Sequence, residues 1–331
     1  MSWRFWKRRE TMPHPGGPGW EQALANHAFL DHLKEQRRSR RWGIFFKLLT
    51  FAYLTAFLVF FQFSEFSELG PSISSGEGHT ALVEVKGFIS PGTSTSADRI
   101  ITALRKAYED ENTKGIILRI NSPGGSPVQA GYINNEIRWL REKHPDIPVY
   151  AVAADMCASG GYYIAVAADA IYVNEASLVG SIGARIDAFG FEGALQDLGI
   201  ERRLLTAGRN KGILDPFSPL PDEQRAFLQG TLDQLHQQFI DVVRTGRGDR
   251  LKGGDEVFSG LFWGGEKSVA LGLADGIGSS SFVARELIGA ERIVKYSSRS
   301  NLLDRFAERL GASIATSLVR LSGIDGYPIV R

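Results

Sequence analysis

The sequence has a single cysteine, Cys157, among its 331 residues. One cysteine excludes an intrachain disulfide and every metal site built on a cluster of cysteines. A dominant charge of either sign is also missing, because 38 Lys and Arg stand against 37 Asp and Glu. Nucleic acids are bound by concentrated basic surfaces, so this balance argues against a nucleic-acid partner. With 43% hydrophobic residues, the chain can bury a full core, and we expect one large domain with appendages.

One long apolar run, WGIFFKLLTFAYLTAFLVFFQF over residues 42–63, stands near the N-terminus and has Lys47 as its only charge. A bilayer crossing takes about 20 helical residues, so this run is long enough to span a membrane. Residues 1–41 contain nine Lys or Arg against four acids, whereas residues 64–80 contain three acids and no Lys or Arg. The positive-inside rule then predicts a cytoplasmic N-terminus and a body beyond the plasma (inner) membrane, in the periplasm or outside the cell.

Two other interpretations of this run are a buried core helix and a cleaved signal peptide. A core helix rarely contains 16 residues, Leu48 to Phe63, without a charge and with Phe on every face. Cleavage is disfavoured because the run starts more than 40 residues into the chain and no small-x-small site follows it. We therefore expect a basic cytoplasmic segment (1–41), a single-pass signal anchor (42–63), a linker (64–80), a catalytic domain (81–290) and a helical tail (291–331).

From residue 81 onwards, strand and helix patterns alternate. Apolar runs predict strands over residues 81–89, 115–122, 147–154 and 170–175. The patterns also predict helices over residues 96–110, 128–143 and 222–247, the first and last of them amphipathic, and a short helix of tightly packable residues over 162–168. Strands that recur with helices between them imply crossover units and a largely parallel α/β sheet.

Two loops in this region contain candidate chemistry. NSPGGSP, residues 121–127, places Gly124 and Gly125 between a strand and a helix, where backbone N–H groups can approach a ligand closely and stabilise an oxyanion. ASGGYYIA places Ser159 and Gly160 at a second strand-to-helix turn, where a helix N-terminus favours developing negative charge. The alternative for the second loop is a tight packing turn without chemistry.

A serine hydroxyl is a weak nucleophile and needs a base beside it. Three of the six histidines precede the apolar run, and we expect the others, His79, His144 and His236, on the surface. A Ser-His-Asp arrangement is therefore disfavoured, and a lysine is the next candidate. Lys211 in TAGRNKGILDPF has glycines and apolar residues around it, and desolvation favours the neutral amine that a general base requires. The alternative is an ordinary loop lysine.

With these residues in view, the chain resembles the short-form signal peptide peptidases of the SppA type, membrane-anchored serine peptidases of family S49 with a Ser/Lys dyad. The resemblance covers about residues 80–290. It depends on the glycine loop INSPGGSP, the nucleophile motif ASGGYYIA, the segment SLVGSIG, the lysine motif TAGRNKG and the closing segment VFSGLFWGGEKSVALGLADGIGS. It implies the α/β fold shared by ClpP and the crotonases, with repeated ββα-type units, preceded by one transmembrane helix.

The resemblance also implies a role for each candidate residue. Ser159 would be the nucleophile, Lys211 the general base, and Ser181 the hydroxyl that orients the lysine amine. The oxyanion hole would combine a backbone N–H of Gly124 or Gly125 with that of Ser159 or its neighbour Gly160, and the sequence does not choose between the two loop glycines. No metal or cofactor is implied.

The implied partners are peptide substrates, such as remnant signal peptides, the lipid bilayer around residues 42–63, and further copies of the chain in a homo-oligomer. Three alternatives stand beside this hypothesis. They are a crotonase-like acyl-CoA enzyme, a cysteine hydrolase that uses Cys157, and a non-catalytic, membrane-tethered interaction module. The tail from Ser297 to Arg331 begins with an amphipathic pattern that suits a neighbouring copy, the membrane surface or a groove.

Overall fold

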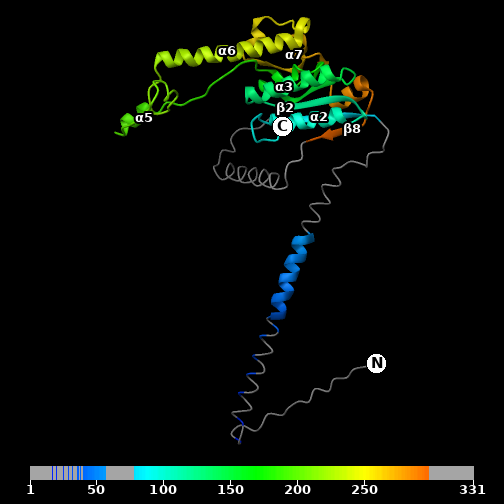
Figure 1. Ribbon diagram of the computed structural model, residues 1–331, viewed down its shortest axis with the longest axis vertical. Helices are drawn as coiled ribbons and strands as arrows, with labels where there is room; N and C mark the ends of the chain where they lie inside the picture. The colour runs from blue at the N-terminus through cyan, green and yellow to red at the C-terminus, as the bar shows by residue number, and fades with distance from the viewer. Residues whose placement is uncertain are drawn as a thin grey trace. The chain divides into compact units, whose positions relative to one another are not determined.

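The structure is a computed structural model that describes residues 40–56 and 78–297, together with isolated positions between 17 and 38 (Figure 1). Contacts divide the chain into two units, Met1–Ser74 and Ser75–Arg331. In the first unit, residues 40–56 are helical, whereas the rest of the expected anchor, residues 57–63, lies outside the described residues, as do most of the expected linker and tail. Among the described residues, no helix is both long enough and apolar enough to cross a membrane. The anchor over residues 42–63 stays a prediction.

The second unit contains one eight-stranded sheet. Its main path runs β6-β5-β3-β2-β1-β8, and β4 pairs with β3 and β7. Every described pairing is parallel except that of β5 with β6. The strands are β1 (His79–Lys86), β2 (Thr113–Ser122), β3 (Val149–Ala158), β4 (Ala170–Val173), β5 (Leu178–Gly180), β6 (Phe262–Trp263), β7 (Gly276–Ile277) and β8 (Ile293–Tyr296).

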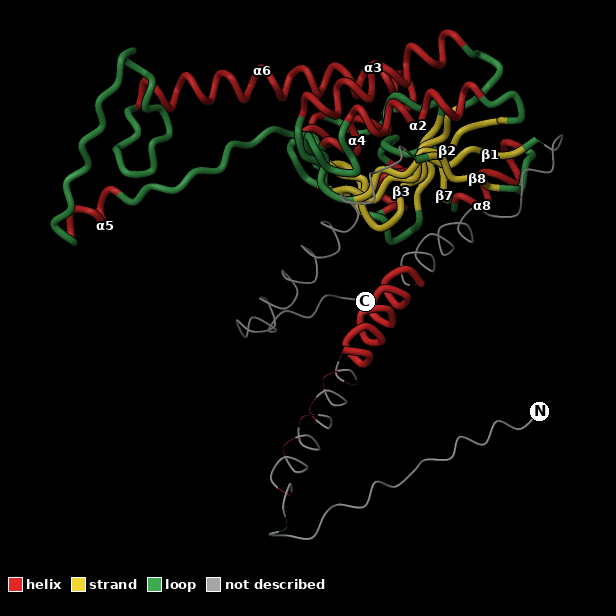
Figure 2. The backbone as a smooth tube through the Cα atoms, turned by 60° about the horizontal axis from the view of Figure 1, so that its bottom comes forward, coloured by secondary structure: helices red, strands yellow, loops and turns green. Residues whose placement is uncertain are grey.

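Helices cover both faces of the sheet (Figure 2). The main core lies between the sheet and α2, α3 and α4, and a smaller core lies between the other face and the segment from α8 to η3. The helices are α2 (Ala97–Glu109), α3 (Pro127–Lys143), α4 (Gly160–Ala165), α5 (Glu192–Asp197), α6 (Asp222–Arg247), α7 (Gly265–Ala270) and α8 (Ser280–Phe282), and η3 (Val283–Ile288) is a π-helix. The predicted α/β class, with its largely parallel sheet, is confirmed.

The strand pattern explains why both faces are covered. In β1, Val83 faces the main core whereas Leu82 faces the smaller one, as expected from the two-residue period of a strand. In β2, Leu118 faces the main core and Ile117 faces the smaller one. Strands buried on both faces read as continuous apolar runs, which is what the sequence has here.

Some element bounds differ from those predicted. The third strand runs on to Ala158, because its last residues pair with β5 and place Ala158 opposite Gly180. The first strand starts at His79, inside the expected linker, because its amide donates a hydrogen bond to the Asn112 carbonyl (2.9 Å). Helix α4 begins at Gly160, so strand and helix leave Ser159 as the single residue between them.

The segment between β5 and α6 extends away from the sheet, with α5 in its outer part (Figures 1 and 2). We call residues 184–221 the arm. Among the described residues, the ring contacts, ion pairs and side-chain hydrogen bonds of the arm are internal or reach the first turn of α6: Phe191 packs on Phe217 (5.8 Å between ring centroids), and Arg209 pairs with Glu223 (2.7 Å). The only residues of α6 that are buried lie in its C-terminal half, so the N-terminal half projects together with the arm.

Candidate active site

Ser159 occupies the sharp turn between β3 and α4. Its backbone has φ 50° and ψ −122°, a conformation that non-glycine residues rarely adopt. Two hydrogen bonds hold the turn: the Ser159 amide donates to the Gly180 carbonyl (2.8 Å), and the Ser159 carbonyl accepts from the Tyr163 amide (2.9 Å). Strained backbone of this kind persists only where its surroundings fix it, and it is concentrated at functional sites.

The glycine loop between β2 and α3 lies directly against Ser159. Gly124 has φ +104°, and a Cβ atom there would stand 2.6 Å from the Cβ and 3.0 Å from the Oγ of Ser159. The same atom would stand 2.8 Å from the Gly160 nitrogen. Only glycine therefore fits at position 124 while the loop touches the serine, and the structure brings together the two loops singled out from the sequence.

The amides of the two loop glycines differ in their hydrogen bonding. Gly124 N–H donates to the Ser122 hydroxyl (3.1 Å), so it is already used. Ile89 bridges the loop through the Gly124 carbonyl (2.9 Å) and the Ser126 amide (2.8 Å), a pattern that directs the Gly125 N–H away from Ile89. Gly125 N lies 3.3 Å from where a Cβ on Gly160 would stand. Within residues 78–297, neither the Gly125 nor the Gly160 amide has a hydrogen-bond acceptor.

Ser181 directly follows the neighbouring strand β5, as Ser159 directly follows β3. Ala158 is paired with Gly180 in the parallel β3–β5 register, so the two serines follow at the same level on strands about 5 Å apart. Ser181 also has a positive φ, 54°, and its amide donates to the Leu261 carbonyl (2.7 Å). The structure thus places two serines with left-handed backbone next to each other.

Lys211 is in the arm, where its side chain is exposed and its amide donates to the Gly208 carbonyl (3.0 Å). Among the described residues, no hydrogen bond joins Lys211 to Ser159 or Ser181. Within one chain, therefore, the structure brings together Ser159, Ser181, Gly125 and Gly160 but leaves Lys211 on the projecting segment.

Cys157 faces the main core two residues before Ser159. Its side chain is 1% exposed, and burial raises the pKa of its thiol to about 12. Because the thiolate is the reactive form of cysteine, a thiol held protonated in the core cannot serve as a nucleophile. The structure thus argues against the cysteine-hydrolase alternative.

The histidines beyond residue 78 differ from the surface positions predicted for them. His79 is 5% exposed and bonds Tyr296 Oη (2.9 Å), and His144 packs on the Tyr108 ring (5.0 Å). His236 is half-buried and bonds the Ile182 carbonyl (3.1 Å), one residue after Ser181. The sequence contained a signal for this contact, because His236 continues the helical spacing of the buried residues in α6.

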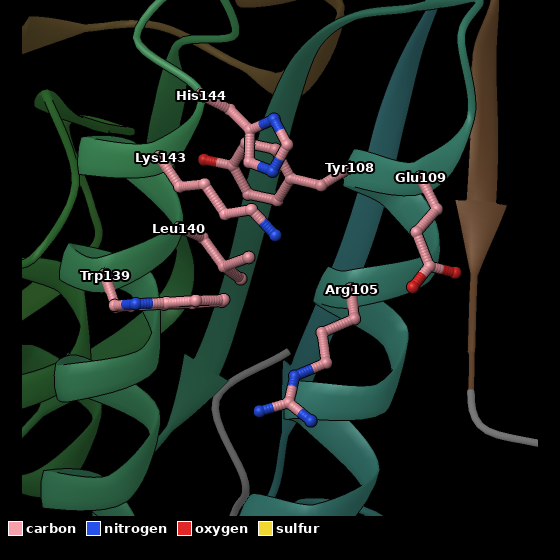
Figure 3. A pocket seen from close by; sticks show the side chains of 7 residues that line it. All are labelled: Arg105, Tyr108, Glu109, Trp139, Leu140, Lys143 and His144. Atoms are coloured by element: carbon pink, nitrogen blue, oxygen red, sulfur yellow. The ribbon is translucent and has the colours of Figure 1, made fainter.

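A cavity of about 310 Å³ lies elsewhere, between the C-terminal ends of α2 and α3. Figure 3 shows Trp139 and Lys143 of α3 and Arg105 and Tyr108 of α2 around it. Helix α3 starts at the glycine loop and rises about 1.5 Å per residue, so its far end lies about 24 Å along the helix axis from that loop. This cavity is separate from the serine site. Within the described residues, no group of His, Cys, Asp and Glu is arranged to hold a metal ion.

This chain is similar to known proteases and to one protein family. The profile of peptidase family S49 matches residues 141–292. A putative protease of Synechocystis sp. is 31% identical over 63% of this chain and 73% of its own length. A putative signal peptide peptidase SppA of Enterococcus faecium is 32% identical over 54% of this chain and 52% of its own length.

A Brucella abortus protein named Na(+)/H(+) antiporter NhaA is 42% identical over 56% of this chain, but the match covers only 25% of that protein. The match thus spans about a quarter of the length of the Brucella protein and about half of the length of the Enterococcus protein. Among solved structures, a membrane-bound stomatin-specific protease, 1510-N, in complex with a substrate peptide aligns with 71% of this chain and 98% of its own chain, with 14% identity and a TM-score of 0.42. By its sequence relatives and by the S49 profile, the chain belongs to peptidase family S49.

Proposed function

We propose that the protein is a serine endopeptidase in which Ser159 is the nucleophile and Lys211 the general base. The observation that carries the proposal is the strained backbone of Ser159, with the unbonded amides of Gly125 and Gly160 beside it. A packing turn needs neither feature. Membership of family S49 favours peptide hydrolysis over acyl-CoA chemistry on the same fold class.

The reaction would begin when the Ser159 hydroxyl attacks a peptide carbonyl carbon while the neutral Lys211 amine accepts its proton. The carbonyl oxygen becomes an oxyanion, and the Gly125 and Gly160 amides donate hydrogen bonds to it. We choose Gly125 over Gly124 because the Gly124 amide already donates to Ser122. The lysine ammonium then protonates the leaving amine, and water hydrolyses the acyl-enzyme with Lys211 again accepting a proton.

The lysine would come from a second copy of the chain. The arm exposes large apolar side chains, including Phe189 (77%), Leu198 (72%) and Leu205 (95%). Several exposed large apolar side chains on one short segment favour an interaction site there. We propose a homo-oligomer in which the arm of one copy covers the serine site of the next, so that Lys211 lies within hydrogen-bond reach of Ser159 and Ser181 of the other copy.

The cellular setting follows from the N-terminal sequence. We propose that residues 42–63 anchor the chain in the plasma membrane with the body on the outer side, as the charge pattern predicts. A peptidase tethered there would meet apolar, unfolded peptides released from the bilayer, and remnant signal peptides have this chemistry. An extended peptide would add to the sheet edge at the serine site, with side-chain pockets for specificity.

The test is peptide cleavage by the full chain in detergent. Ser159→Ala and Lys211→Ala should each reduce cleavage to background while the melting temperature stays near that of the wild type. Because the proposed site is shared between copies, a mixture of the two inactive variants, exchanged under mild dissociation, should regain part of the activity. Undiminished cleavage by either variant alone contradicts the assignment, and a mixture that stays inactive contradicts the shared site.

A further inference from the structure

We propose that His236 is a positioning residue for the serine site, a role that rests on the proposed peptidase function. Its imidazole joins α6 to the backbone directly after Ser181, through Nε2 and the Ile182 carbonyl oxygen (3.1 Å). A carbonyl oxygen can only accept, so Nε2 must be the protonated nitrogen of the ring. His236 therefore acts as a hydrogen-bond donor here.

The strand turn that His236 holds supports both serines. Three consecutive residues of the turn are bonded to three different elements. Gly180 O accepts the Ser159 amide (2.8 Å), the Ser181 amide donates to Leu261 O (2.7 Å), and Ile182 O accepts from His236. The first of these bonds fixes the nucleophile itself. The second and third fix the residues after β5, next to the Gly180 carbonyl that accepts the first bond.

The two serines depend on this support more than ordinary residues would. Ser159 and Ser181 have φ values of 50° and 54°, which non-glycine residues adopt only when their surroundings enforce them. Ile182 is fully buried, so its carbonyl has no water to replace the imidazole if His236 is removed. Loss of the donor therefore leaves the turn free to relax and to shift Ser181 and the Gly180 carbonyl.

His236 also marks the point where α6 leaves the body. Phe239, Val243 and Arg247 are the buried residues of the helix, and His236 continues their row by three residues towards the N-terminus. Phe239 packs on the ring of Tyr163 in α4 (5.1 Å between ring centroids). Beyond His236, α6 has no buried residue and extends to the arm that contains Lys211 (Figure 2). The same hydrogen bond thus links the support of the serines to the support of the arm.

The test compares two substitutions at this position in the full chain. His236→Gln keeps an N–H donor at about the same reach, whereas His236→Leu keeps the bulk and removes the donor. The matched control is Gln237→Leu, because the neighbouring Gln237 is exposed and bonds only Asp241 of its own helix. The measurements are the rate of fluorophosphonate labelling of Ser159, kcat and KM for a peptide substrate, and the melting temperature.

We expect His236→Leu to lower the labelling rate and kcat by at least about tenfold, because small misplacements of reacting groups are costly. KM should change by less than about twofold, and the melting temperature should fall by only a few degrees. His236→Gln should restore labelling to within about twofold of the wild type, a result that also excludes His236 as the general base. Gln237→Leu should match the wild type.

Two results would overturn the inference: wild-type labelling in His236→Leu, or a Gln variant as slow as the Leu variant at an unchanged melting temperature. A wild-type chain that labels at a residue other than Ser159 would instead contradict the proposed function. The two failures are therefore distinguishable in one set of experiments.

Discussion

Gly124 offers a sharp test of the contact between the glycine loop and the nucleophile. In a Gly124→Ala variant, the new methyl group would stand 2.6 Å from Ser159 Cβ, 3.0 Å from its Oγ and 2.8 Å from the Gly160 nitrogen. Two of these three atoms belong to the short Ser159 side chain and one to backbone, so no long, flexible chain can turn aside. The loop, the serine or both must move.

Two costs add in this variant. An alanine at φ +104° is strained by about 1–2 kcal/mol, and insertion of a methyl group into a tightly packed site costs about 1–3 kcal/mol. Together these give a loss of about 2–5 kcal/mol in the free energy of unfolding, unless the site relaxes by displacing Ser159. A displacement near 1 Å would instead appear as a loss of about 100-fold in activity.

The assay is denaturant unfolding of the full chain, combined with fluorophosphonate labelling and peptide cleavage. Gly131→Ala is the matched control, because a Cβ at Gly131 meets no atom within 4 Å and the residue lies inside α3. That variant should be more stable than the wild type by about 0.4–1 kcal/mol and equally active. A Gly124→Ala protein with wild-type stability and wild-type labelling would refute the packing described here.

Three further predictions concern the body around the site. Arg247→Met should lower the free energy of unfolding by about 2–3 kcal/mol in denaturant titrations, because the largely buried Asp275 loses both hydrogen bonds from Arg247 (2.7 and 2.9 Å) and keeps only the longer contact from Arg250 (3.4 Å) and the Ile171 amide (2.7 Å); a loss below about 1 kcal/mol would contradict this. Burial lowers the pKa of His79 despite the nearby Asp110 carboxylate, so the unfolded state binds more protons near the unfolded-state pKa of about 6.5, and stability should fall from pH 7 to pH 5. Thermal melts of His79→Gln should have a weaker dependence over this range, and an identical slope in both proteins would exclude His79 as the cause. Cys157→Ala should cleave peptides at a rate within about twofold of the wild type. A folded but inactive variant would instead support the cysteine-hydrolase alternative.

Local patterns predicted most of the fold. Helix α6 has the bounds expected from its sequence, Asp222–Arg247, and α2 and α3 differ from expectation by a residue or so at their ends. The end of β3 was less predictable, because Met156 to Ala158 pair with β5, more than twenty residues later in the chain, and Cys157 also pairs with Ser122 of β2 after a register shift. Pairing between residues so far apart leaves no local hydrophobic pattern from which the end of the strand could be predicted.

In the candidate site, too, the residues marked by local motifs were predicted, whereas contacts between distant residues were not. Ser159, Gly124 and Gly125 lie at the ends of predicted strands, and parallel strands bring their carboxyl ends to one edge, so these residues meet as the motifs suggested. The contact of His236 was missed: the helical spacing of α6 places this residue on the same row as the buried residues, but no local pattern identifies a backbone carbonyl 54 positions earlier as its partner. Among the described residues, Lys211 has no hydrogen bond to the serine site of its own chain, and the contact with a second copy that we propose would leave no local pattern in the sequence.

The central claim is that an amine from position 211 activates the hydroxyl at position 159. The most direct measurement is fluorophosphonate labelling of the assembled full chain, followed by peptide mapping of the modified residue. The account predicts one modified residue, Ser159, and loss of that modification in Lys211→Ala with the fold intact. Labelling at another residue, or undiminished labelling of Ser159 in Lys211→Ala, would contradict it.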